Sequence, residues 1–153
     1  ETGPDMGFKH VIPHLVERFM NNETPFRMHG HDQTRAFSYI DDTIKGTVLA
    51  MESDMAAGEI FHIGSSKEIS IEELIRAVGE MMGYSGEYVE AATYPGSVSR
   101  RCPDISKAKR LLGYNPQIDW RIGLTSTVEW YKAYFLKNKT ARQDGFKEQK
   151  KFN

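Results

Sequence analysis

The sequence has almost no cysteine and no long apolar run, and these absences exclude several classes of protein. The single cysteine, Cys102, rules out an internal disulfide and fits a reducing, cytoplasmic compartment. The sequence contains no run of about 18 apolar residues, so no membrane span is predicted. The start of the sequence shows no signal peptide. With 20 basic and 21 acidic residues, the net charge of −1 argues against nucleic acid as a partner.

Motifs for catalysis and phosphate binding are missing as well. There is no G-x-S-x-G turn of the kind that presents a nucleophilic serine. A glycine-rich phosphate loop is also missing, because Gly83 and Gly86 are followed by Val89 where a third glycine would be needed. These patterns predict no catalytic residue in this chain.

The histidines raise the question of a metal site. His29, His31 and Asp32 are close in sequence, and His10 and His14 are four residues apart, a spacing that can bind zinc on a regular helix. No Glu-x-x partner pattern accompanies them. We therefore predict no metal site and interpret these histidines as polar residues of a loop and a helix surface.

The composition is that of an ordinary globular domain, with 39% hydrophobic and 27% charged residues in 153. Apolar residues recur at helical spacing in five segments, and four segments have the composition of strands. The predicted helices cover about 8–20, 42–57, 70–82, 104–112 and 122–137, and the predicted strands cover 26–29, 35–40, 59–64 and 87–94. This alternation predicts a mixed α/β fold of helices and short strands.

The clearest local signal is the start of the helix near residue 70. Ser70 is followed three residues later by Glu73, which is the pattern of a capping box. Ile69 and Leu74 form the matching hydrophobic pair across the cap, and Gly83 stands where a C-terminal cap belongs.

Aspartates are predicted to begin two other helices. Asp104 precedes a short helix that ends at Gly113, and Asp41 or Asp42 precedes a longer one. The apolar face of the longer helix consists of Ile44, Val48, Met51 and Met55.

The two ends of the chain differ from its centre. Residues 139–153 contain five basic and two acidic residues, and we interpret them as a basic, flexible tail that follows a domain at residues 1–138. The first residues, ETGPDM, have no initiator Met, so we expect the chain to be processed, tagged or cut from a longer one.

Arginines are the strongest candidates for ligand binding. Arg35 precedes a predicted strand, while Arg100 and Arg101 lie in a loop ahead of a helix. A guanidinium group presents a planar set of donors that matches phosphate oxygens, so two such loops could clamp a diphosphate. The alternative for each arginine is a surface ion pair. The residues alone thus indicate an α/β domain with a candidate anion site.

Five stretches of the sequence form a further pattern: GPDMGFKHVIPHLVERFM, HGHDQTRAFSYIDDTIKGTVLAME, GEIFHIGSSKEISIEELIRAV, PGSVSRRCPDISKAKRLLGYNP and GLTSTVEWY. In this order they resemble the carboxy-terminal half of the extended short-chain dehydrogenases/reductases, the NAD-dependent enzymes that act on nucleotide sugars. The second is similar to the family's Gly-x-Gly-x-Gln-x-Arg-x-Phe-x-Tyr-Val-x-Asp block, and the fourth to its Arg-x-x-Asp loop and Leu-Gly-Tyr-x-Pro ending. Together they cover roughly residues 3–135.

The resemblance implies roles for individual residues. Arg35 would meet the nucleotide or its diphosphate, and Arg101, or alternatively Arg100, would hold the diphosphate from the other side. The residues expected beside the base and sugar are Lys9, His10 and Val11. The amino-terminal half of the family's fold, its Rossmann core, would complete the pocket.

The sequence departs from the family pattern at several points. His62, which the resemblance places among the substrate-binding residues, stands where the family usually has asparagine, and Tyr94 and Ser97 replace an Arg and an Asp of some members. None of the seven tyrosines has lysine four residues later, so the family's Tyr-x-x-x-Lys pair is missing. The glycine-rich dinucleotide fingerprint is missing too.

Three hypotheses follow. In the first, the chain is the substrate-binding portion of a UDP- or dTDP-sugar epimerase, dehydratase or decarboxylase, binds no NAD by itself and is inactive alone. In the second, it is a non-enzymatic nucleotide-sugar-binding or assembly module. In the third, it is a histidine-based metal binder.

The first hypothesis has a physical corollary. Without the Rossmann core, the apolar faces at 8–19 and 44–55 would be uncovered, and an uncovered patch usually acquires a partner. We therefore expect self-association, as a homo-oligomer, or an altered packing.

Overall fold

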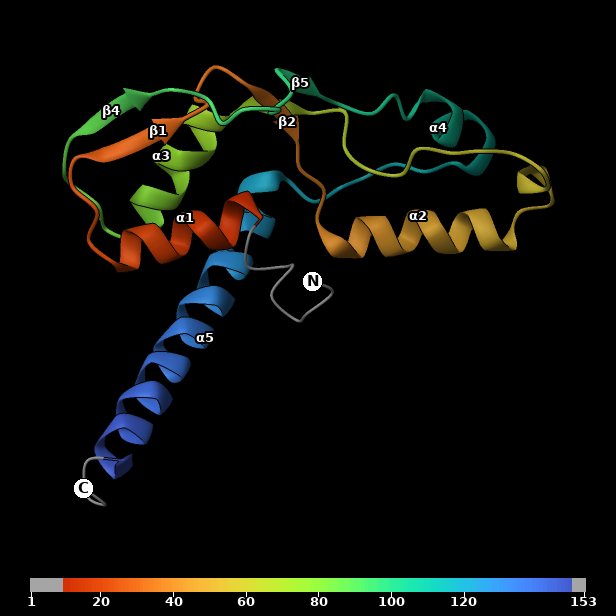
Figure 1. Ribbon diagram of the computed structural model, residues 1–153. Helices are drawn as coiled ribbons and strands as arrows, with labels where there is room; N and C mark the ends of the chain where they lie inside the picture. The colour runs from red at the N-terminus through yellow and green to blue at the C-terminus, as the bar shows by residue number, and fades with distance from the viewer. Residues whose placement is uncertain (1–9, 150–153) are drawn as a thin grey trace.

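The computed structural model describes residues 10–149, with the side chains of residues 10–138, and Figure 1 shows its elements. The helices are α1 (Val11–Met20), α2 (Ile40–Glu52), the 3-10 turn η2 (Asp54–Ala56), α3 (Ile71–Met81), α4 (Ser106–Leu112) and α5 (Trp120–Gln149). The strands are β1 (Phe26–His29), β2 (Thr34–Ala36), β3 (Glu68–Ser70), β4 (Tyr88–Ala91) and β5 (Arg100–Arg101). The predicted mixture of helices and short strands is confirmed.

The strands form two small sheets. β1 pairs in parallel with β4, so that Phe26 lies opposite Tyr88. In the other sheet β2 is central, antiparallel to β3 and parallel to β5. Segments that are far apart in sequence therefore meet on β2.

The larger hydrophobic core lies where α1, α3 and the first half of α5 pack together against β1 (Figure 1). Each helix contributes the apolar stripe that its spacing predicts. The buried residues include Leu15, Val16 and Phe19 from α1, Leu74, Ile75 and Val78 from α3, Leu124 and Val128 from α5, and Phe26 and Met28 from β1. Burial of a side chain of this size is worth about 1.5–3 kcal/mol.

The start and end of α3 follow the predicted pattern. The Ser70 hydroxyl accepts a hydrogen bond from the Glu73 backbone N–H at 3.0 Å, and the Glu73 carboxylate accepts one from the Ser70 N–H at 2.7 Å. Gly83 follows the helix with a φ of +71°, which glycine adopts without strain. The capping box thus fixes the start of α3 directly after the last residue of β3.

A second, smaller core lies in the part of the molecule that we term the extension, residues 40–64 and 102–118 (Figure 1). Its buried residues are Ile105, Ala108, Leu112 and Tyr114, with Phe61 and Ile63 packed against them. A Cβ at Gly46 would lie 2.5 Å from Ile63 and 2.8 Å from Tyr114. α2 packs this closely because position 46 has no side chain.

Asp42 connects α2 to the chain that returns from α4. Its buried carboxylate accepts hydrogen bonds from the backbone N–H groups of Gln117 at 3.0 Å and Ile118 at 2.8 Å. The prediction that Asp41 or Asp42 caps this helix is wrong. The N-cap is Tyr39, which has no side-chain cap bond, and both aspartates lie in the first turn, where the helix dipole favours a negative charge.

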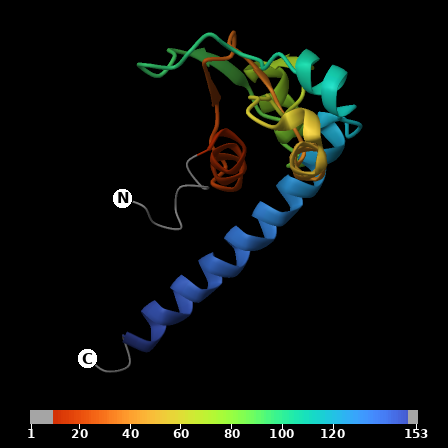
Figure 2. The same ribbon diagram turned by 90° about the vertical axis from the view of Figure 1, so that its right-hand side faces the viewer.

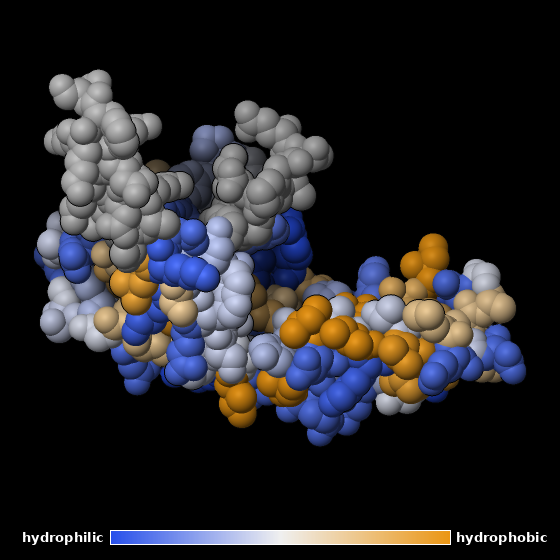
Figure 3. Space-filling model, turned by 90° about the horizontal axis from the view of Figure 1, so that it is seen from below, coloured by the Kyte–Doolittle hydropathy of each residue, from blue (hydrophilic) through white to orange (hydrophobic). Residues whose placement is uncertain are grey.

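The side of α2 that faces away from α4 exposes apolar residues, which Figure 3 shows as a hydrophobic band. This α2 face consists of Ile40, Ile44, Val48, Leu49 and Met51 on α2 and Met55 on η2, with Ile60 in the loop that follows. The uncovered face predicted on α2 is confirmed. The one predicted at residues 8–19 is wrong over the described part of that segment, because α1 buries its stripe against α3 and α5.

Some strand predictions are also wrong. Residues 59–64 form no strand, and of the segment 35–40 only the start pairs, because α2 begins at Ile40. Conversely, the predicted loop at Arg100–Arg101 is strand β5. A strand forms only where another backbone satisfies its N–H and C=O groups. The segment 59–64 has no such neighbour in the described part of the chain.

α5 extends to Gln149, beyond the predicted end at residue 137. Figure 2 shows its second half projecting from the rest of the molecule. The flexible tail predicted for 139–153 stays a prediction, because the side chains from 139 and all of 150–153 lie outside the described residues. Over the part of the chain that the structure describes, the helices are too short or too polar to cross a bilayer.

Asp42→Ala is expected to lower the free energy of unfolding by about 2–3 kcal/mol, because two backbone N–H groups lose their acceptor. Asp41→Ala is the matched control, since Asp41 is exposed in the same helical turn. Urea denaturation of both variants separates the buried hydrogen bonds from the effect of the helix dipole. Equal losses of stability would contradict the role of Asp42.

Candidate functional site

The pairing of β2 with β5 brings together two of the predicted site residues. Arg35 on β2 lies directly opposite Arg101 on β5 in the parallel register. Neighbouring strands are about 4.8 Å apart, and residues in register project from the same face of a sheet. The two arginine side chains therefore start from adjacent positions on one face.

Arg35 is half-buried, and its guanidinium group is held by neutral oxygens. It donates to the backbone carbonyls of Thr34 and Val98, both at 2.7 Å, to the side-chain oxygen of Gln33 at 3.0 Å, and to the carbonyl of Ser99 at 3.5 Å. Partial burial, followed by the positive charge of Arg101, lowers the pKa of Arg35. Arginine stays protonated in proteins, so Arg35 keeps a positive charge that these acceptors do not neutralise.

Arg101 is exposed and adds a second positive charge. Among the described side chains, neither Arg35 nor Arg101 forms an ion pair with a carboxylate. Within residues 10–138, a surface ion pair is thus formed by neither of them. Two adjacent guanidinium groups are suited to binding phosphate oxygens.

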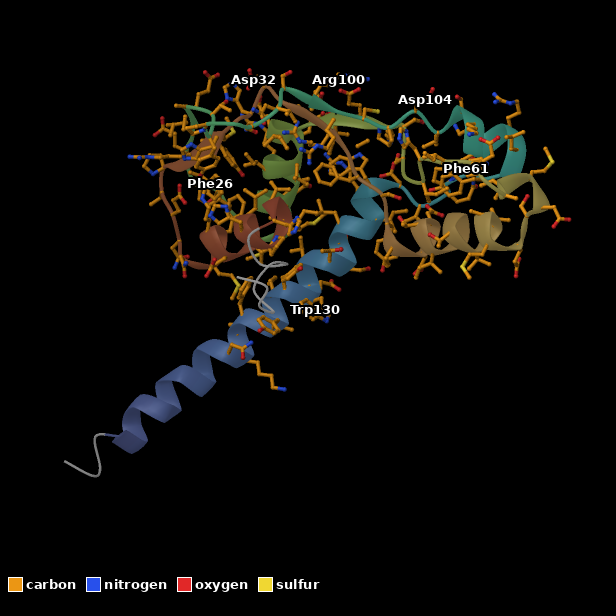
Figure 4. The ribbon with its side chains drawn as sticks, turned by 45° about the vertical axis from the view of Figure 1, so that its right-hand side comes forward. Phe26, Asp32, Phe61, Arg100, Asp104 and Trp130 are labelled. Carbon is orange, nitrogen blue, oxygen red and sulfur yellow. The ribbon has the colours of Figure 1, made fainter. Side chains whose placement is uncertain are left out.

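Arg100 differs from Arg101 because it has a carboxylate partner. Its Nε and Nη2 donate to Glu68 Oε2 at 3.1 and 2.8 Å. The Thr34 hydroxyl donates to the other oxygen of Glu68, and this hydrogen bond, followed by the one from Arg100, lowers the pKa of Glu68. Figure 4 shows Arg100 at the outer edge of the molecule. Its charge is balanced by Glu68 and not by the candidate ligand site.

The loop of residues 92–99 is tied to the same place. The His29 ring stacks on Tyr94 with centroids 4.6 Å apart, and the Ser97 hydroxyl donates to the Gln33 side-chain oxygen at 2.7 Å. The sequence interpretation assigned no role to Gln33 and treated His29 as an ordinary loop residue. The available signal was the HGHDQTR block itself, in which this glutamine stands two residues before the arginine.

The other predicted site residues lie elsewhere. His62 is exposed in the extension near Asp104, whose pKa is lowered chiefly by a backbone hydrogen bond and more weakly by His62. His10 is exposed just before α1, Val11 packs against the larger core, and Lys9 lies outside the described residues. Within residues 10–138, no group of three His, Cys, Asp or Glu side chains is arranged to hold a metal ion.

Two junctions between a strand and a helix lack the features of a dinucleotide site. A pyrophosphate binds where glycines let it approach the free N–H groups of a helix start. At the junction of β3 and α3, Ser70 and Glu73 form the capping box, and there is no glycine. Residues 37–39, between β2 and α2, contain none either. The arrangement can bind an anion through side chains, and neither of these two junctions has the glycine-rich turn of a dinucleotide site.

The sequence matches a family described as GDP-mannose 4,6 dehydratase over residues 2–127. The UDP-N-acetyl-alpha-D-glucosaminuronate decarboxylase of Bacillus cytotoxicus is 29% identical over 138 residues, which are 86% of this chain and 42% of the relative. The UDP-glucuronic acid decarboxylase 1 of Xenopus tropicalis is 34% identical over 122 residues, which are 80% of this chain and 28% of the relative.

Solved structures give the same result. The UDP-glucuronic acid 4-epimerase of Bacillus cereus, solved with UDP-glucuronic acid and NAD, is 30% identical, with a TM-score of 0.73 over 83% of this chain and 41% of its own. The dTDP-glucose 4,6-dehydratase of Streptomyces venezuelae, solved with NAD, is 30% identical, with a TM-score of 0.73 over 86% and 41%. The chain thus spans less than half the length of these relatives. It belongs to the GDP-mannose 4,6 dehydratase family and corresponds to the carboxy-terminal half of the NAD-dependent nucleotide-sugar epimerases and dehydratases.

Proposed function

We propose that this chain is the nucleotide-sugar-binding portion of an NAD-dependent epimerase or dehydratase, and that Arg35 and Arg101 bind the diphosphate of the nucleotide sugar. The observation that carries this proposal is the pair of arginines in register, which form no ion pair with a carboxylate among the side chains of residues 10–138. The related Bacillus cereus epimerase was solved with a UDP-sugar. UDP- and dTDP-linked sugars all have a diphosphate between the nucleoside and the sugar.

The charges of the site support a diphosphate over a neutral ligand. Like charges opposite one another on adjacent strands are destabilising, and the effect of Arg101 on the pKa of Arg35 reflects this repulsion. A diphosphate carries negative charge on two neighbouring phosphates, so each guanidinium can face one of them. The ligand would thereby remove a repulsion that the free chain contains.

We place the redox chemistry outside this chain. The Bacillus cereus and Streptomyces venezuelae relatives hold NAD and are more than twice as long as the part that this chain matches. This sequence has no Tyr-x-x-x-Lys pair, and the junctions of β3 with α3 and of β2 with α2 lack the features of a dinucleotide site. An NAD-binding half would therefore have to supply both the cofactor and the catalytic base.

The α2 face is the surface on which we propose that this half packs. One side of α2 covers the smaller core, yet the other exposes Met51 by 79% and Ile44 by 52%. A helix with apolar residues on both sides is expected to be buried in a larger protein. Ile60 is 82% exposed in the segment 59–64, which has the composition of a strand. A sheet in the NAD-binding half would give that segment its missing neighbour.

A non-enzymatic nucleotide-sugar-binding or assembly module would contain the same arginines. The exposed α2 face favours the enzyme portion, because a free-standing module would have no reason to keep it uncovered. Self-association into a homo-oligomer is the competing way to cover this face and stays a prediction.

Arg35→Ala is expected to weaken the binding of UDP- and dTDP-sugars by about 1.5–3 kcal/mol, because charge-assisted hydrogen bonds to phosphate are lost. Isothermal calorimetry on the chain measures this loss. Arg27→Ala, which removes an exposed arginine from β1, is the matched control and should bind like the wild type. Equal affinity in the Arg35 variant and the wild type would refute the assignment.

Arg101→Ala is expected to weaken UDP-sugar binding at least tenfold, whereas Arg100→Ala changes it less than threefold. The difference arises because Arg100 is already paired with Glu68, and Arg101 is not paired among the described side chains. The same calorimetric titration compares the two variants. A larger loss in the Arg100 variant would reverse the assignment of the two neighbours.

The chain by itself is expected to bind no NAD, because the residues that would hold the cofactor belong to the other half. Titration with NAD, followed by equilibrium dialysis, measures this, and a UDP-sugar serves as the positive control for a folded chain. Stoichiometric NAD bound to the isolated chain would contradict the division of roles.

A further inference from the structure

Gln33 has an unusual environment for a surface sheet. It is 7% exposed, and with Asp42 it is one of two polar side chains buried within the described part of the chain. Burial of an amide is unfavourable unless its polar atoms find partners. Asp42 is explained by the backbone groups that it binds, whereas nothing in the packing of the core requires an amide at position 33.

The partners of Gln33 are the arginine and the loop of the anion site. Its Oε1 accepts hydrogen bonds from Arg35 Nη2 at 3.0 Å and from the Ser97 hydroxyl at 2.7 Å. A guanidinium group can only donate, so the atom that faces it must be the amide oxygen. One buried oxygen therefore joins Arg35 to the loop of residues 92–99.

The backbone of Gln33 is fixed on both sides. Its N–H donates to the Gly30 carbonyl at 3.0 Å, and its carbonyl accepts from the Ile71 N–H at 2.8 Å, at the start of α3. A Cβ at Gly30 would lie 3.1 Å from the Gln33 side chain, and the φ of +63° there also favours glycine. The amide thus occupies the space that a side chain at position 30 would take.

We propose that Gln33 is the positioning residue of the anion site, which directs the guanidinium of Arg35 without neutralising it. This inference rests on the proposed function and deepens it. A carboxylate at position 33 would orient Arg35 equally well, but it would form an ion pair and cancel the charge that a diphosphate needs. An apolar residue would keep the charge and lose the orientation. An amide orients Arg35 and leaves its charge uncancelled.

Two variants of the full chain separate orientation from charge, with UDP as the probe in calorimetry. Gln33→Glu is expected to lower UDP affinity at least tenfold, with an unchanged or raised melting temperature. Gln33→Leu is expected to lower it about fivefold. Gln117→Glu adds the same charge at an exposed glutamine and should stay within twofold of the wild type.

Nitrogen-15 NMR of the guanidinium groups supplies a readout that a merely structural role would not change. Hydrogen-bonded Nη groups rotate slowly and give separate signals, and the Arg35 signals are assigned with Arg35→Lys. We expect separate signals in the wild type and in Gln33→Glu. In Gln33→Leu we expect faster exchange between the Nη signals, because Nη2 then keeps only the Val98 carbonyl as its acceptor.

The outcomes distinguish the two proposals. If Arg35→Ala loses UDP binding while both Gln33 variants bind like the wild type, the inference is wrong and the proposed function stands. If the wild type binds no UDP, the proposed function fails. The NMR comparison then still decides, because unchanged Arg35 signals in Gln33→Leu would overturn the positioning role.

Discussion

The pairing of β2 with strands on both sides is the constraint on which the candidate anion site depends. Strands of two or three residues have little stability of their own. β3 is held in place because its last residue, Ser70, begins the capping box of α3, and α3 is anchored in the larger core. β5 is then aligned by β2, which sets Arg101 opposite Arg35. The core thus determines the position of two arginines at the surface through a short chain of backbone contacts.

The two hydrophobic cores are enclosed to different degrees by the helices and strands around them. The larger one is enclosed by three helices and β1, whereas the smaller one has α2 as its outer wall and leaves the far side of that wall apolar and exposed. The close approach at Gly46 and the buried Asp42 give the extension a defined shape. Its exposed apolar side is the kind of patch that usually marks an interaction surface.

Features that depend on neighbours in sequence could be predicted, and those that depend on distant pairing could not. The capping box, the glycine after α3 and the stripe of α5 are local, and the structure has them. The arginines were found through a motif, but their register depends on a contact between β2 and β5 that no local pattern encodes. The same limit explains Asp42, which was interpreted as a cap because its true partners lie far along the chain. Residues 59–64 have a strand's composition, and composition does not show whether a neighbouring strand exists.

The capped start of α3 affects how the binding of a phosphate at the nearby candidate site would depend on ionic strength. Its first N–H groups donate to the carbonyls of Gln33 and His31 and to the Ser70 hydroxyl, so they are not available to a phosphate. Positive charge at the candidate site therefore comes from the side chains of Arg35 and Arg101. Salt screens such exposed charges over about 8–10 Å at physiological concentrations. At cellular ionic strength, attraction over long distances is weak, so the proposed recognition would rely on the short, directional hydrogen bonds of two planar groups.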